Sequence, residues 1–140
     1  MRLMTQIQNN LLAIISLTVA ITALGYTTYR NELTEQNRNI RQAGFEILRE
    51  LNKLQLLIDL AHYDKNKSRG NPIQGWNHIL YIRDMSLLVS DPIVARSRKL
   101  KQEWSLHWNK VRNSEQSNKI VTSAINGFRT ELRSTIQNLQ

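Results

Sequence analysis

A long uncharged stretch near the amino terminus constrains this chain more than any other feature. No charged residue lies between Arg2 and Arg30, and residues 11–24 read LLAIISLTVAITAL. A helix of about 20 residues is needed to cross the hydrocarbon core of a bilayer. The stretch supplies that length if Tyr26 and Tyr29 lie at one interface, where tyrosine is favoured. We therefore expect residues 1–29 to form a transmembrane signal-anchor.

A cleaved signal peptide is the alternative for the same stretch. Its strongly apolar part is short, and Ala23-Leu24-Gly25 offers small residues with the spacing that a signal peptidase requires. Against cleavage, the polar residues 5–10 do not form a charged leading region, and the helical pattern continues without a turn signal until Asp64. The sequence favours an uncleaved single span.

The charge distribution indicates which partners the domain favours and on which side of the membrane it lies. The chain has 19 Lys and Arg residues against 11 Asp and Glu, and because Arg2 is the only charge before Arg30, the domain after the span carries a net charge of +7. A basic domain favours anionic partners. Arg30, Arg38 and Arg41 follow the span, so the positive-inside rule favours a cytoplasmic domain. A short Met-Arg tail also occurs in anchors that export the rest of the chain, which leaves the side open.

Beyond Tyr29 the sequence predicts a single all-α domain over residues 30–140. From Ile40 to Ala61 the apolar residues are separated by 4, 3, 4, 3, 4 and 3 positions, which is the heptad seam of a packed helix. The seam consists of Ile40, Gly44, Ile47, Leu51, Leu54, Ile58 and Ala61. This helix is expected over about 30–63 and ends before a polar loop.

Three further helices are predicted from residues that mark helix boundaries and from apolar periodicity. Asn71-Pro72 and Asp91-Pro92 are typical helix starts, and a polar break lies at residues 113–118. The expected helices cover about 72–89, 92–112 and 117–139, and no segment alternates with the period of a strand. Short loops between four amphipathic helices favour an antiparallel four-helix bundle. Large aromatic residues expected in its core are Trp76, Trp104, Trp108 and Phe128.

The second helix is the best candidate for binding a partner, because it is apolar nearly all round. Trp76, Leu80 and Leu87 lie on one side and are expected to pack inward. The opposite side carries the candidates Tyr81, Ile82, Met85, Leu88 and Val89. Such a helix is either buried centrally or offers its second face to another subunit or protein.

Basic residues form two groups that are candidates for contact with anionic lipid headgroups. They are Lys65, Lys67, Arg69, Arg96, Arg98, Lys99 and Lys101. A solvated surface is the alternative for the same residues. Nucleic acid is not expected as a partner, because no recognised binding motif or stacking platform occurs.

Residue types that carry chemistry are sparse. His62, His78 and His107 are the only histidines, no cysteine is present, and no Glu-x-x-His or His-Glu-x-x-His spacing occurs. Nucleophile-elbow and phosphate-binding glycine patterns are also missing. We expect no metal site, no cofactor and no enzymatic activity.

Part of the chain resembles known bacterial proteins. The segments RNELTEQNRNIRQAGFEIL and AHYD, RGNPIQGW and ILYIRDMSLL, which span Arg30 to Leu88, are similar to those of small, uncharacterised bacterial membrane proteins. The resemblance implies a single-pass inner-membrane protein and supplies no activity. The architecture also resembles the four-helix sensory domains of chemoreceptors, at the level of fold alone.

These observations predict a membrane-tethered helical interaction or scaffold protein. It would bind a protein partner or itself through the second helix and the seam of the first. The alternative is a sensory or ligand-binding bundle outside the cytoplasm, with a pocket near Trp76, Trp104 and Trp108.

Overall fold

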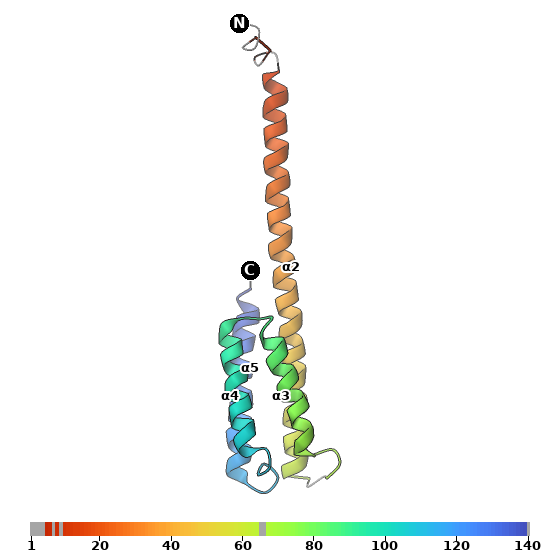
Figure 1. Ribbon diagram of the computed structural model, residues 1–140, viewed down its shortest axis with the longest axis vertical. Coiled ribbons are helices and arrows are strands. Elements are labelled where there is room, and N and C mark those ends of the chain that lie inside the picture. Colours follow the sequence, from red (N-terminus) through yellow and green to blue (C-terminus); the bar gives the residue numbers. More distant parts are fainter. Residues whose placement is uncertain (1–4, 7, 9, 65–66, 140) are drawn as a thin grey trace. The chain divides into compact units, whose positions relative to one another are not determined.

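Four helices make up the regular structure of the described residues. The computed structural model describes residues 5–6, 8, 10–64 and 67–139. Its helices are α2 (Leu11–His62), α3 (Pro72–Ser86), α4 (Asp91–His107) and α5 (Glu115–Gln137) (Figure 1). The expected all-α class is confirmed. The chain divides into two units, Met1–Gln36 and Asn37–Gln140, and α2 runs without a break through the division between them.

The second unit is a four-helix bundle whose helices alternate in direction (Figure 1). Polar contacts connect α2 to both of its neighbours. Glu50 on α2 lies 2.6 Å from His78 on α3, and Arg129 on α5 donates a hydrogen bond of 2.9 Å to Asn52 on α2. The antiparallel arrangement follows from short connections between consecutive helices.

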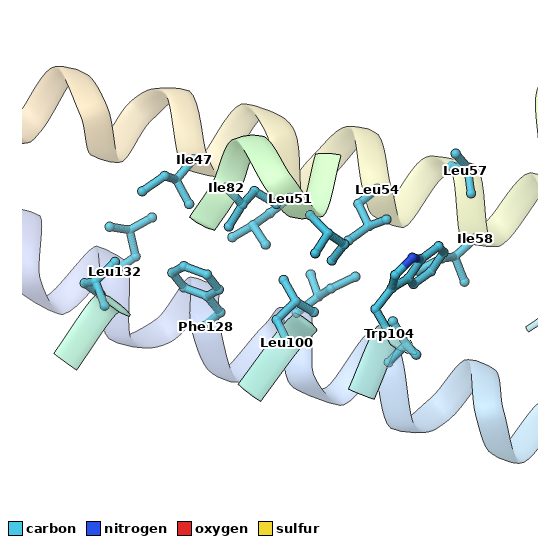
Figure 2. Packing of buried hydrophobic residues seen from close by; sticks show 14 of the residues in the cluster. Ile47, Leu51, Leu54, Leu57, Ile58, Ile82, Leu100, Trp104, Phe128 and Leu132 are labelled. Atoms are coloured by element: carbon cyan, nitrogen blue, oxygen red, sulfur yellow. The ribbon is translucent and has the colours of Figure 1, made fainter. Parts of the chain in front are cut away.

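The predicted seam of α2 forms one wall of the core. Its residues from Gly44 to Ala61 are buried, and Ile40 is partly buried against them. Their side chains point toward those of α3, α4 and α5 (Figure 2). The opposing buried residues are Ile79, Ile82, Ile93, Leu100, Trp104, Val121, Ile125, Phe128 and Leu132. Of the four aromatic residues expected in the core, Trp104 and Phe128 are fully buried, whereas Trp76 and Trp108 are only partly buried.

The helix starts agree with the predicted positions to within two residues. The side chain of Asn71 accepts a hydrogen bond of 3.1 Å from the backbone N–H of Ile73, so it caps α3 as expected for an Asn-Pro pair. Helix α4 ends at His107, earlier than the expected residue 112. The following residues form turns, and the carbonyl of Val111 lies 2.8 Å from Nδ1 of His62. A side chain from another helix therefore holds the chain in the turn.

Two glycines allow helices to approach closely. A Cβ atom added to Gly75 would lie 2.2 Å from Cζ2 of Trp104, whose side chain is fully buried. A Cβ atom added to Gly44 would lie 2.6 Å from the end of the Ile136 side chain, which is only partly buried. The indole has no room to move in a packed core, whereas the isoleucine can change rotamer. Gly75 is therefore the glycine that the bundle requires.

Replacement of Gly75 by alanine is predicted to destabilise the bundle by about 1–3 kcal/mol, because the new methyl group displaces Trp104. Gly127→Ala is the matched control, since the added Cβ meets only Arg96 at an ordinary 3.6 Å. It should stabilise α5 by about 0.5–1 kcal/mol through helix propensity. Chemical unfolding of the full chain in detergent, followed by circular dichroism, measures both effects. Equal stability of the two variants would contradict the packing described here.

Candidate membrane segment and docking surface

The amino-terminal part of α2 is an apolar helix that the chain leaves uncovered. An 18-residue window within α2, near the N-terminus, has a mean hydropathy of 1.8, and none of its residues is buried. Large apolar side chains there are well exposed, from 46% for Ile14 to 80% for Leu12. By length and composition this is the one helix among the described residues that can cross a membrane. A continuous apolar surface of this extent is not typical of protein exposed to water.

Hydroxyl groups within the apolar segment bond to their own helix. Ser16 donates to the carbonyl of Leu12 at 2.8 Å, and Thr22 donates to the carbonyl of Thr18 at 2.8 Å. Thr18, Thr27 and Thr28 make equivalent bonds four residues back. These internal bonds satisfy the hydroxyl donors without water, which lowers the cost of placing them in hydrocarbon.

The end of the segment carries residues suited to a membrane interface. Tyr26 and Tyr29 are both well exposed, and the guanidinium of Arg30 lies 6.0 Å from the centre of the Tyr26 ring. Tyrosine and arginine at the end of an apolar helix place polar groups at headgroup depth. The length of helix between Leu11 and Tyr29 is about 28 Å, close to the hydrocarbon thickness.

Helix α3 carries more exposed large apolar residues than any other helix of the bundle, including α2, which exposes Phe45 and Leu56 there. Helix α3 and the turn that follows it carry five exposed large apolar residues. These are Ile73, Leu80, Tyr81, Leu87 and Leu88, with exposures of 63%, 40%, 41%, 67% and 59%. By contrast, α4 contributes only Leu106, and α5 contributes none among its described residues. This outward surface of α3 is the candidate docking surface.

The prediction of which α3 residues face outward was partly wrong. Ile82 is 1% exposed and Val89 is 9% exposed, so these two candidates belong to the core and cannot contact a partner. Met85 is partly buried against the core. Tyr81 and Leu88 are exposed as expected. Conversely, Leu80 and Leu87, which were expected to pack inward, are exposed.

The seam of α2 is also unavailable to a partner. It was expected to help bind another protein, but the chain's own helices bury it. The physical reason is that α3, α4 and α5 together enclose the apolar side of α2 over its carboxyl-terminal half. The expected contribution of this seam to partner binding is therefore wrong.

The candidate basic residues do not converge on one site. Lys67 and Arg69 lie in the connection between α2 and α3, whereas Arg98, Lys99 and Lys101 lie near the middle of α4. The connection lies at one end of the bundle and the middle of α4 lies away from that end, so the two groups are separate (Figure 1). Arg96 forms an ion pair of 3.1 Å with Glu131 on α5. Lys65 lies outside the described residues.

A groove of about 650 Å³ lies between α4 and α5, and the sequence analysis did not anticipate it. Its hollow comes from small residues on α5, namely Ser123, Ala124 and Gly127. Arg96 and Lys119 on its walls already pair with Glu131 and Glu115. Of the residues expected to form a tryptophan pocket, Trp104 is fully buried and lies edge-on to Trp76, and neither of them lines this groove.

The histidines serve as connections between elements. His107 Nδ1 lies 3.0 Å from the hydroxyl of Ser117, and its Nε2 lies 3.8 Å from Glu103. This order resembles a Ser-His-acid arrangement, but Ser117 is only 4% exposed and 3.8 Å is too long for a hydrogen bond. A substrate therefore has no access to this hydroxyl. In the described part of the chain, no three His, Asp or Glu residues gather as metal ligands.

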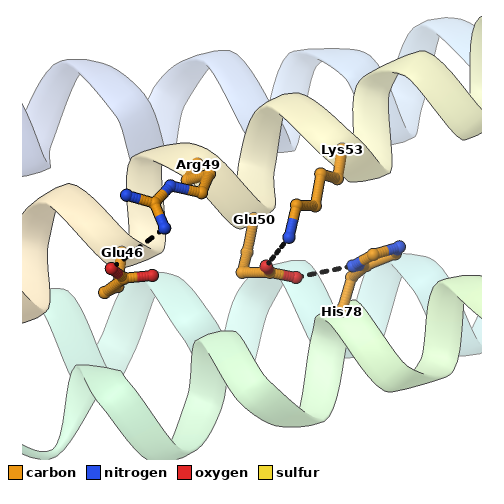
Figure 3. Close-up of polar contacts among 5 residues, drawn as sticks. All are labelled: Glu46, Arg49, Glu50, Lys53 and His78. Carbon is orange, nitrogen blue, oxygen red and sulfur yellow. Dashed lines mark hydrogen bonds and ion pairs between the residues drawn. The ribbon is translucent and has the colours of Figure 1, made fainter.

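Glu50 forms the strongest polar connection between α2 and α3 (Figure 3). Its carboxylate lies 2.6 Å from Nδ1 of His78 and accepts a hydrogen bond of 2.7 Å from Lys53. Its side chain is 12% exposed. Burial is the largest single influence and raises the pKa of Glu50, but the hydrogen bonds and charges of Lys53 and His78 together outweigh it and hold that pKa below its ordinary value.

Comparison with known protein families, curated proteins and solved structures finds no match to this chain. The geometry of its own residues therefore carries the functional argument.

Glu50→Gln is predicted to destabilise the bundle at neutral pH by about 1–3 kcal/mol, because it removes a charged acceptor from two hydrogen bonds. A lowered pKa means that the native carboxyl binds a proton less readily than the unfolded one. Its stabilising effect is therefore present above the ordinary pKa of glutamate and is lost as the pH falls through the lowered value. The difference between wild type and variant, measured by denaturant unfolding from pH 7 to pH 3, should shrink toward acid.

Glu46→Gln is the matched control for this experiment. Glu46 lies one turn earlier on α2 and pairs at 3.2 Å with the exposed Arg49 alone (Figure 3). Loss of such a surface pair changes stability by less than about 1 kcal/mol. If the two variants behaved alike at every pH, Glu50 would have no special role in joining α2 to α3.

Proposed function

We propose that this chain is a single-pass membrane protein whose non-enzymatic helical bundle docks a protein partner or a second copy of itself. The single observation that carries the proposal is the pair of uncovered apolar surfaces, one on the first half of α2 and one on α3. Water-exposed apolar surface is costly, so each surface is expected to be covered by another phase or another protein.

The first half of α2 is proposed to be an uncleaved anchor. Its exposed side chains surround the helix on all sides, which is typical of a helix in lipid and unlike an amphipathic core helix. The same helix continues into the buried seam of the bundle, so cleavage near Ala23-Leu24-Gly25 would cut within regular helix. Because Arg30, Arg38 and Arg41 follow the span, the positive-inside rule favours a bundle on the cytoplasmic side of a bacterial inner membrane. There, Arg98, Lys99 and Lys101 would attract anionic headgroups.

Val19→Arg is predicted to release the protein from membranes, because a charge at the centre of the span costs about 2.5–3.5 kcal/mol. Extraction of isolated membranes with alkaline carbonate, followed by immunoblotting, measures the retained fraction. The wild-type chain should stay in the membrane at its full length. Gln42→Arg adds the same charge to an exposed position beyond the span and should have no effect.

Release of the wild-type chain by carbonate would overturn the anchor. Recovery of a shortened chain that begins at about Tyr26, just after Ala23-Leu24-Gly25, would instead identify a cleaved signal peptide.

The outward surface of α3 is proposed to be the docking surface. Its apolar residues project from a regular, capped helix that rests on Trp104 through Gly75, so the surface is held rigidly. Rigid apolar surfaces lose little conformational entropy when they bind. The polar groups nearest to it, Arg83 and Asp84, pair with each other at 2.9 Å and remain exposed.

Leu80→Asp is predicted to abolish association, because a carboxylate at the centre of the interface would be buried without a partner. After chemical cross-linking in isolated membranes, the wild-type chain should migrate in denaturing electrophoresis as a complex larger than the monomer, and the variant should migrate as the monomer. Leu106→Asp, which changes an exposed leucine on α4, is the control and should keep the complex. Circular dichroism should show equal helicity for all three. A complex that survives Leu80→Asp would exclude this surface.

A further inference from the structure

Three apolar residues of α3 repeat at intervals of seven positions on its outward surface. Ile73, Leu80 and Leu87 are 63%, 40% and 67% exposed. Seven residues advance a helix by nearly two full turns, so all three lie on one narrow stripe. The backbone of Leu87 keeps helical dihedral angles (φ −62°, ψ −22°), so the stripe extends through the C-cap. One apolar residue in every seven supplies half of the two-position seam of a coiled coil, so a second helix would pack along a narrow line.

The flanks of this stripe carry opposite charges. At about 100° per residue, Arg83 lies on one side of the line through Leu80 and Leu87, and Asp84 lies on the other. Their side chains are 42% and 58% exposed. When two parallel helices are related by a twofold axis along their length, opposite flanks meet. Arg83 of each copy then faces Asp84 of the other, so the ion pair within each chain is exchanged for two equivalent ion pairs between the chains.

We propose that the partner of α3 is a second copy of this chain, bound in parallel and in register along Ile73, Leu80 and Leu87. This inference rests on the proposed function, because two copies anchored in one membrane by α2 present α3 in the same direction. An antiparallel pair would place Ile73 opposite Leu87 and would leave Arg83 facing Trp76 instead of a carboxylate. Charge complementarity and the common anchor therefore both favour the parallel register.

The apolar stripe is small, so the proposed dimer depends on the anchor to raise its effective concentration. Fifteen residues of helix extend about 22 Å, and one such stripe buries less than the roughly 1,600 Å² of a standard protein interface. A weak interface becomes populated when both partners are confined, because confinement raises the effective concentration. Self-association is therefore expected in the membrane even when few copies are present per area of lipid. In dilute detergent the association is expected to be weak.

The absence of cysteine from the sequence provides a direct test. Ile73→Cys, Leu80→Cys and Leu87→Cys are introduced singly into the full chain, and isolated membranes are oxidised. A disulfide requires Cα atoms about 4.4–6.8 Å apart, so only residues that face their own copies react efficiently. Each of the three variants should form disulfide-linked dimers. Leu106→Cys, which is 56% exposed on α4, should not.

Two outcomes would overturn the inference. Dimers from Leu80→Cys alone, with Ile73→Cys linking only to Leu87→Cys when both are co-expressed, would establish an antiparallel pair. No dimers at any of the three positions, in chains that resist carbonate extraction, would exclude self-association through α3 while leaving the anchor intact. Carbonate release of the chain would be a failure of the proposed function itself.

A charge exchange tests the register independently. Asp84→Arg in the Leu80→Cys background should reduce the dimer yield several-fold, because Arg83 then faces arginine on the other copy. The double exchange Arg83→Asp with Asp84→Arg should restore the yield. Both positions are exposed, so helicity should be unchanged. A dimer yield that is unchanged by Asp84→Arg, or that stays low in the double exchange, would contradict the proposed pairing.

Discussion

One helix of this chain must satisfy two different surroundings, and the rest of the structure depends on that constraint. From Leu11 to Tyr29 α2 has no charged residue and is exposed on all sides, whereas from Gly44 onward most of its apolar residues are buried on one side. The change in pattern determines where protein can pack, because only a one-sided helix leaves a polar face for water. The boundary between the two units falls after Gln36, between the segment that is apolar all round and the segment with one buried side.

The free energy gained by packing the core outweighs the cost of an unpaired polar group within it. Trp104 is fully buried and its indole N–H has no hydrogen-bond partner among the described residues. Such an unpaired donor costs about 1–3 kcal/mol. Removal of a buried tryptophan side chain costs about 3–5 kcal/mol, so packing outweighs the lost hydrogen bond. Gly75 makes this possible, because any larger residue there would collide with the ring.

The sequence was informative where one physical signal acted alone. The spacing of the seam from Ile40 to Ala61 identified the buried side of α2, because one apolar stripe dominates this part of the helix. Asn71-Pro72 marked the start of α3, because capping depends on two adjacent residues and on nothing distant. Both signals are local, and both predictions are confirmed.

The sequence was ambiguous where two signals competed. Helix α3 is apolar nearly all round, so periodicity alone did not determine which side is buried. The contact of Gly75 with Trp104 decides it, and that contact joins residues far apart in the chain. It brings Ile79 and Ile82 into the core and turns Leu80 and Leu87 outward. The pairing of Glu50 with His78 was missed for the same reason, since neither residue has a local pattern that points to the other.

An anchored bundle has less need of a large interface than a freely diffusing one. Association in solution must offset the loss of translational and rotational freedom of two molecules, which costs about 4–15 kcal/mol. The proposed span in the membrane would already remove part of that freedom and align the two copies. The apolar stripe and the two proposed ion pairs would then suffice for a reversible contact, and a larger exposed surface would favour aggregation instead. In this view the uncovered apolar half of α2 and the modest stripe of α3 are matched, since the first lowers the cost that the second must overcome.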